Sequence, residues 1–188
     1  MIDKAYAFLL EELNGYLNTR YPSTEPHAVL SALLNQDGTV PPAIENKLVL
    51  SLVNVEREAV LPGVGMQARN GGGGYVQISP ALTLNLYLLV TAHFGGNYTE
   101  ALKFLSGALA FFQGKPLFTP QNSPAFPKEL EKLSLEMVSL DFQALNNLWS
   151  NLGGKYLPSV LYKVRMIGVQ EGRIAALVPG ASGAGASM

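Results

Sequence analysis

Cysteine is absent from this chain of 188 residues, and its absence excludes several kinds of site. Without a thiol there is no disulfide, no thiol nucleophile, no cysteine-ligated zinc and no iron–sulfur cluster. The compartment stays open, since the absence suits a reducing cytosol and also a particle that later meets oxidising surroundings. A chain of this length buries about 70% of the surface that it exposes when unfolded, so one domain is stable without cross-links.

Charged residues are also scarce. They make up 14% of the chain, with a net charge of −1, whereas about 25% is typical of soluble domains. Lys and Arg are scattered, and nucleic-acid-binding proteins show a basic patch or stripe, so we expect no nucleic-acid partner. Two interpretations of the sparse charge remain open: an oligomer that hides part of its surface, or a well-packed monomer with a surface of Ser, Thr and Asn.

No apolar run reaches the roughly 18 residues that a membrane helix needs. The most apolar segment, 81–94, is interrupted by Thr83, Asn85 and Thr91. Residues 1–17 mix acidic and apolar residues and lack a basic start, which argues against a signal peptide. We therefore expect no membrane insertion.

The hydrophobic pattern predicts helices and strands in alternation. Three-and-four spacing predicts helices at 2–18, 97–113 and 141–152, with caps at Asn97 and Asp141; the last helix carries an apolar stripe of Phe142, Leu145, Leu148 and Trp149. Strands are expected at 47–57, 81–94, 133–140 and 159–169. The two long strands at 47–57 and 81–94, joined by a long connection that holds the glycines, are expected to pair as an antiparallel hairpin or a near relative of one. The segment 27–34 fits a strand or a short helix, and the turn after it favours a strand; a short piece at 173–178 is expected to pair with the strand at 159–169. The predicted fold class is α/β (α+β): a mixed, mostly antiparallel sheet of about five strands with helices packed on it. Residues 1–178 are expected to form one domain, and 179–188 a flexible tail of glycine, alanine and serine.

Four consecutive glycines, Gly71, Gly72, Gly73 and Gly74, raise the question of a phosphate-binding loop. Such a loop needs Lys-Ser/Thr after the last glycine and a helix whose amino terminus faces the anion. Here Tyr75 and a strand-like Val-Gln-Ile follow, and Arg69 is the nearest cation. The pattern therefore favours a pliable connection that contacts a partner, since glycine permits close backbone approach.

Other catalytic or metal-binding patterns are also missing. His27 and His93 lie in separate elements without metal-ligand spacing. Glu56 and Glu58 share one side of a strand end, but no group is placed to activate a water between them. We expect no enzyme activity, no cofactor and no metal, which favours a structural or assembly role.

Three stretches together resemble one family. They are MIDKAYAFLLEELNGYL, NLYLLVTAHFGGNYTEALKFLSGALAFFQGKPLF and LNNLWSNLGGKYLPSVLYKVRMI. They resemble the tail-terminator or cap proteins of contractile injection systems, which are phage-tail-like particles. The resemblance covers roughly residues 1–170, and its most specific part is the order of Trp, Gly-Gly and Pro-x-x-x-Tyr-Lys-x-Arg. Some relatives are longer at the carboxyl end, so this chain looks like a short form.

The resemblance implies a structural protein that forms a ring, expected to be a homohexamer, at the baseplate-distal end of the tube. Its expected partners are copies of itself, the tube protein and the sheath protein, whose growth it stops. It would assemble in the cytoplasm as a component of the particle. Two alternatives remain: another tail-completion or adaptor protein of the same particle, and a small-ligand-binding α/β domain.

Interface residues follow from the same expectation. A head-to-tail ring needs two different surfaces on each subunit. The candidates are the glycine-rich loop with its flanks, the helix-borne Trp149, the last long strand and the start of the tail, namely Arg69, Gly71–Gly74, Tyr75, Trp149, Tyr162, Lys163, Arg165 and Pro179. Trp149 has two interpretations, a core anchor or an interface hot spot. Lys163 and Arg165 share a face and are either solvated or paired with an acidic neighbour.

Overall fold

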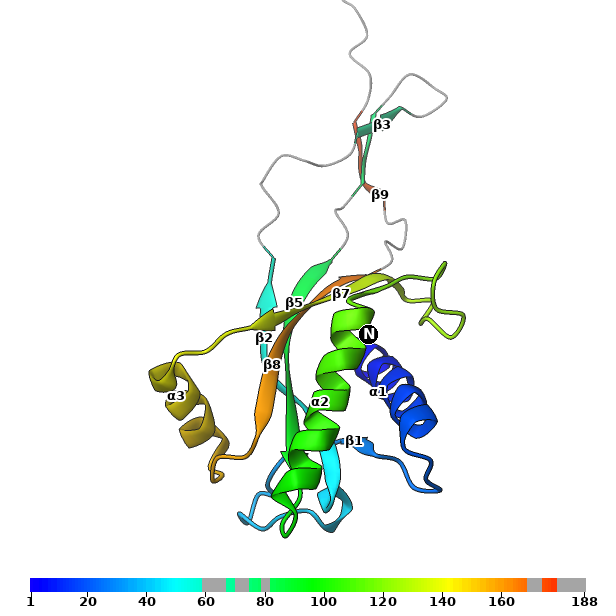
Figure 1. The fold of residues 1–188 in the computed structure, drawn as a ribbon. Coiled ribbons are helices and arrows are strands. Elements are labelled where there is room, and N and C mark those ends of the chain that lie inside the picture. Colours follow the sequence, from blue (N-terminus) through cyan, green and yellow to red (C-terminus); the bar gives the residue numbers. More distant parts are fainter. Residues whose placement is uncertain (59–66, 70–74, 79–81, 169–173, 179–188) are drawn as a thin grey trace, which may run out of the picture.

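In the computed structural model, a six-stranded sheet forms the centre of the chain (Figure 1). The structure describes residues 1–58, 67–69, 75–78, 82–168 and 174–178. In chain order, the elements are α1 (Ile2–Arg20), β1 (Ala28–Leu30), the 3-10 turn η1 (Pro42–Ile44), β2 (Lys47–Arg57), β3 (Gln67–Arg69), β4 (Tyr75–Ile78), β5 (Thr83–His93), α2 (Tyr98–Gly114), β6 (Leu117–Phe118), β7 (Leu130–Val138), α3 (Phe142–Leu152), β8 (Ser159–Gly168) and β9 (Ile174–Val178).

The strand order in this sheet is β1-β2-β5-β8-β7-β6. Only β1 and β2 are parallel; the other neighbours are antiparallel. The predicted fold class is confirmed, with six strands where about five were expected. The long strands β2 and β5 pair as predicted, with a register shift between Leu52 and Asn54.

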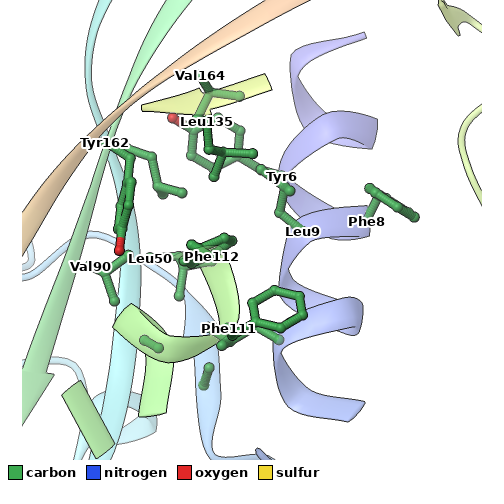
Figure 2. Packing of buried hydrophobic residues seen from close by; sticks show 14 of the residues in the cluster. Tyr6, Phe8, Leu9, Leu50, Val90, Phe111, Phe112, Leu135, Tyr162 and Val164 are labelled. Carbon is green, nitrogen blue, oxygen red and sulfur yellow. The ribbon is translucent and has the colours of Figure 1, made fainter. Parts of the chain in front are cut away.

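The sheet is covered on both faces. Helices α1 and α2 pack on one face and α3 lies on the other (Figure 1). The larger core cluster lies under α1 and α2, where Phe112 packs against Tyr162 of β8 with ring centroids 5.0 Å apart (Figure 2). The smaller cluster lies under α3 and includes Val49, Leu89 and Trp149. Alternation along β8 explains the split, since Tyr162, Val164 and Met166 belong to the first cluster and Leu161 to the second.

Helix ends follow the predicted caps. The Asn97 side chain accepts the backbone N–H of Glu100 at 3.1 Å, and Asp141 accepts that of Ala144 at 2.7 Å. The Glu100 carboxylate binds Lys103 at 3.2 Å, which is one turn further along the helix. Gly153 ends α3 in the left-handed conformation, with φ of 70°, where glycine carries little steric strain.

Three strands form a separate sheet in the order β3-β4-β9. This order repeats that of β2-β5-β8, the strands to which they are joined in sequence. The ends of β2, β5 and β8 lie together: Glu58 N–H donates to the Thr83 carbonyl and Gly168 N–H to the Leu82 carbonyl, each at 3.1 Å. The small sheet is drawn beyond this end of β2 and β5 (Figure 1).

One predicted strand is shorter than expected, and another pairs with a different partner. The segment 27–34 forms a strand only at Ala28–Leu30, because the chain leaves the sheet after Ser31 donates to the Leu50 carbonyl. The segment near 173–178 pairs with β4 and not with β8. The predicted long connection between β2 and β5 also contains two short strands: β4, which begins at Tyr75 and includes the strand-like Val-Gln-Ile, and β3, which was not expected. The predicted flexible tail lies outside the described residues.

Candidate functional site

The glycine-rich loop falls between β3 and β4, two short strands of the small sheet. Gly71–Gly74 and Pro179 lie outside the described residues. Arg69 ends β3 and Tyr75 begins β4, and the two are register partners. The glycines therefore separate two strands that pair with each other, and not the long strands β2 and β5 as the sequence had suggested.

Trp149 and Tyr162 are buried on opposite faces of the sheet. Trp149 is 5% exposed and belongs to the cluster under α3. Tyr162 is 4% exposed and belongs to the cluster under α1 and α2, and burial raises the pKa of its hydroxyl to about 12. Each side chain contributes to the core in the subunit described here.

Lys163 and Arg165 lie on the face of β8 that also bears Leu161, which is the α3 face, and both are half-buried. Arg165 Nε donates to Glu58 Oε2 at 2.6 Å, so this base pairs with an acid of its own chain. The Tyr87 hydroxyl donates to Glu56 Oε2 at 2.9 Å on the same face. Lys163 is the register partner of Glu136 on β7 and of Tyr87 on β5.

This arrangement gives the two carboxylates different tasks. Glu56 accepts from a phenol and Glu58 from a guanidinium, so each carboxylate has a donor of its own. The contact between Glu58 and Arg165 links the end of β2 to β8 across the intervening strand β5. Within the described part of the chain, no group of three His, Asp or Glu side chains could hold a metal ion.

The histidines lie at the ends of strands and have structural surroundings. His27 Nε2 is 2.6 Å from the Tyr21 carbonyl oxygen, and its ring lies 5.0 Å from that of Phe104. His93 is the last residue of β5. None of the helices in the described residues has the length and apolar character needed to cross a membrane.

Two uncharged surfaces stand out, one on each side of the sheet. The first, which we call the α3 patch, is a depression of about 320 Å³ whose walls include Phe142, Leu145, Trp149 and Tyr156. The rings of Trp149 and Tyr156 meet edge to face, with centroids 5.7 Å apart. Tyr156 is 58% exposed and Phe142 is 92% exposed, although the sequence places Phe142 in the buried stripe.

The second surface, the α2–β7 groove, is a depression of about 330 Å³. It is walled by apolar side chains of α2, β7 and β8, chiefly Leu109, Phe112, Met137 and Tyr162. Met137 is 56% exposed and is the register partner of Tyr162. Neither surface is lined by Asp, Glu, Lys or Arg. Sequence reasoning missed Met137 and Tyr156, since alternation and helical spacing do not show where a covering helix ends.

Two solved structures with a similar fold are a terminator and a cap. One is the sheath/tube terminator of an extracellular contractile injection system, PVC, in its extended state, with a TM-score of 0.56 and 13% identity over 95% of this chain and 63% of that chain. Another is the tube-terminating cap of the anti-feeding prophage, with a TM-score of 0.58 and 14% identity over 100% of this chain and 61% of that chain. The chain thus spans less than two thirds of the length of either. At such identities the similarity shows a shared fold. No curated protein matches the chain.

A family model gives the stronger result. The model described as the Pvc16 N-terminal domain matches residues 6–179. The match extends from the first helix to the end of β9 and includes all three stretches on which the resemblance rested, apart from the first five residues. The predicted membership of a terminator or cap family of contractile injection systems is thereby confirmed, and the chain belongs to the Pvc16 N-terminal domain family.

Proposed function

We propose that this chain is a tail terminator, or cap, of a contractile injection system. The observation that carries the proposal is the family match over residues 6–179. The fold shared with a sheath/tube terminator and a tube-terminating cap supports it. The role is structural: the subunit occupies the end of a tube and presents surfaces to its neighbours, without a chemical step.

In this proposal, copies of the chain form a ring, a homohexamer, at the baseplate-distal end. The ring stops growth of the tube and sheath and holds the last sheath ring to the tube. The tube protein and the sheath protein are its partners, and the complex assembles in the cytoplasm before it becomes part of the particle. A ring of this kind uses two different surfaces on each subunit, because a head-to-tail contact closes only by rotation.

The glycine-rich loop and the tail remain proposed contacts. Gly71–Gly74 allow a close approach of backbone to a partner, and residues from Pro179 would gain order only on assembly. A chain that ends at Val178 tests the tail. Tubes of normal length capped by this shortened chain would remove the tail from the proposal.

Deletion of the gene from its particle is the experiment that tests the function. The expected result is tubes of uncontrolled length, or sheaths lost from the baseplate-distal end, in negative-stain images. Supplying the wild-type gene in trans should restore uniform lengths. Particles that keep a uniform length and a firmly held sheath without the gene would contradict the proposal and favour an adaptor elsewhere in the particle.

A further inference from the structure

The α2–β7 groove is open because β6 is short. Strand β6 has two residues, which pair with β7 at Leu133 and Ser134. The Leu135 N–H then donates to the Pro116 carbonyl, and the outer edge of β7 from Glu136 to Val138 has no strand partner among the described residues. The exposed side chain of Met137 lies at this open end.

The groove has the size and chemistry to hold an aromatic side chain. An apolar cavity of about 150 Å³ accommodates a benzene ring. The groove measures about 330 Å³ and has walls of Leu109, Ala110, Phe112, Pro116 and Met137 among others. It can therefore hold one aromatic ring together with part of a neighbouring side chain.

Phe142 is an aromatic side chain that its own subunit leaves uncovered. It is the first residue of α3 and is 92% exposed. From Phe142 to Leu152 the helix carries no charged residue, so its surface is dehydrated at little electrostatic cost. Aromatic and methionine side chains with few charges are typical of the central part of a protein interface.

The two surfaces face opposite sides of the sheet. The groove lies on the side of α2, where Met137 and Tyr162 point, and Phe142 belongs to α3 on the other side. One subunit therefore does not fill its own groove. A projecting side chain and a groove at different places on one molecule are what a head-to-tail contact between identical copies requires.

We propose that Phe142 of one copy inserts into the α2–β7 groove of a second copy, and that this contact joins neighbouring subunits of the ring. The inference rests on the proposed function, since it supplies the contact by which a terminator ring closes. The occupant is a second copy of this chain.

Charge at the margins of the two surfaces supports this choice. The exposed Asp141 precedes Phe142, and Lys115 precedes Pro116 of the groove. Lys115 Nζ donates to Glu12 Oε2 at 2.8 Å and has two further N–H donors. When Phe142 of one copy occupies the groove of a second copy, Asp141 of the first copy approaches Lys115 of the second.

Self-association of the purified full chain tests the contact. We expect Phe142→Ala to weaken association by about 10- to 100-fold at each interface, as measured by sedimentation velocity and native mass spectrometry. Ala110→Glu, which places a charge in the groove, should have a similar effect. Tyr98→Ala, a 65% exposed aromatic on α2, and Ala7→Glu, at an exposed position on α1, are matched controls that should associate like the wild type.

Cross-linking gives a second measurement that does not depend on stability. Because the chain has no cysteine, Gln143→Cys and Gln113→Cys place the only two thiols beside Phe142 and at the groove. A short bis-maleimide should then join copies into a ladder of covalent oligomers. The ladder should be absent when Ala7→Cys replaces Gln113→Cys, and should be lost when Phe142→Ala is added.

Several outcomes overturn the inference. If Phe142→Ala associates like the wild type, the contact between subunits lies elsewhere on the chain. The same holds if the cross-linked ladder forms equally well with Ala7→Cys. In either case the chain still forms a ring, by a different contact. A wild-type chain that remains monomeric at every concentration excludes a second copy as the occupant. Neither outcome decides whether the chain is a terminator, because the gene deletion tests that role separately. Failure of the proposed contact can therefore be distinguished from failure of the proposed function.

Discussion

Replacing Tyr6 by phenylalanine is expected to stabilise this protein. Tyr6 is 2% exposed within the larger core cluster (Figure 2), and its hydroxyl has no hydrogen-bond partner among the described residues. Burial also raises the pKa of this hydroxyl above its usual value. A buried hydroxyl without a partner carries a desolvation cost of about 1–3 kcal/mol. Phenylalanine keeps the packed ring and removes that cost, so we expect the free energy of unfolding to rise by about 1 kcal/mol.

Urea and thermal unfolding of Tyr6→Phe measure this gain. For a chain of this size, 1 kcal/mol raises Tm by about 2–4 °C. Tyr16→Phe is the matched control, because the exposed Tyr16 hydroxyl accepts from Arg20 Nη1 at 3.1 Å, and its stability should change by less than about 0.5 kcal/mol. A Tyr6→Phe protein that is less stable than the wild type would refute the reasoning, since its hydroxyl would then have to make a favourable hydrogen bond when folded.

Three further perturbations have defined outcomes. Stability should fall as pH rises from about 10 to about 12, since unfolded tyrosine ionises near 10 whereas burial raises the pKa of Tyr162 to about 12. Tyr162→Phe should make this part of the urea–pH profile less steep, and Tyr6, whose pKa burial also raises, should account for the slope that remains. Gly107→Leu should lower the free energy of unfolding by about 1–3 kcal/mol, because a Cβ atom added at Gly107 comes 2.9 Å from Leu17 Cδ2. Gly15→Leu is the control and should not lower it, because a Cβ atom added at Gly15 has no other atom within 4 Å. Asp141→Ala should cost about 1 kcal/mol through loss of the α3 cap and speed amide exchange at Ala144, with Asp141→Asn as the control. Equal Tm values for Gly107→Leu and Gly15→Leu would contradict the glycine prediction. An unchanged amide-exchange rate at Ala144 in Asp141→Ala would contradict the capping prediction.

The sequence predicts the long elements well because each repeats a local rule many times. The strand at 47–57 and the helix at 141–152 have bounds within a residue of the prediction, since alternation, a cap and a terminal glycine all agree there. Pairing between distant segments follows no local rule. The partner of β9 is β4, a short strand inside a glycine-rich connection, and no pattern within either strand identifies the other as its partner.

The candidate site could be predicted only in part, for a related reason. Helical spacing places Phe142 and Trp149 on one stripe, two turns apart, and burial then depends on how far the sheet reaches beneath the helix. Trp149 is covered and Phe142 is not. In the same way, alternation places Lys163 and Arg165 on one face, but it does not show that Glu58 is the partner of Arg165. Exposure and pairing are properties of the assembled fold.

The shared order of the two sheets has a mechanical consequence. Because β3, β4 and β9 are joined in sequence to β2, β5 and β8, a force on the small sheet enters the body through three neighbouring inner strands of the larger sheet. Such a pull acts along these strands, across hydrogen bonds that lie perpendicular to them, so many bonds share the load at once. The edge strands β1 and β6, with three and two residues, would bear little of it. In the terminator that we propose, tension on the small sheet would therefore be carried along this one axis of the body.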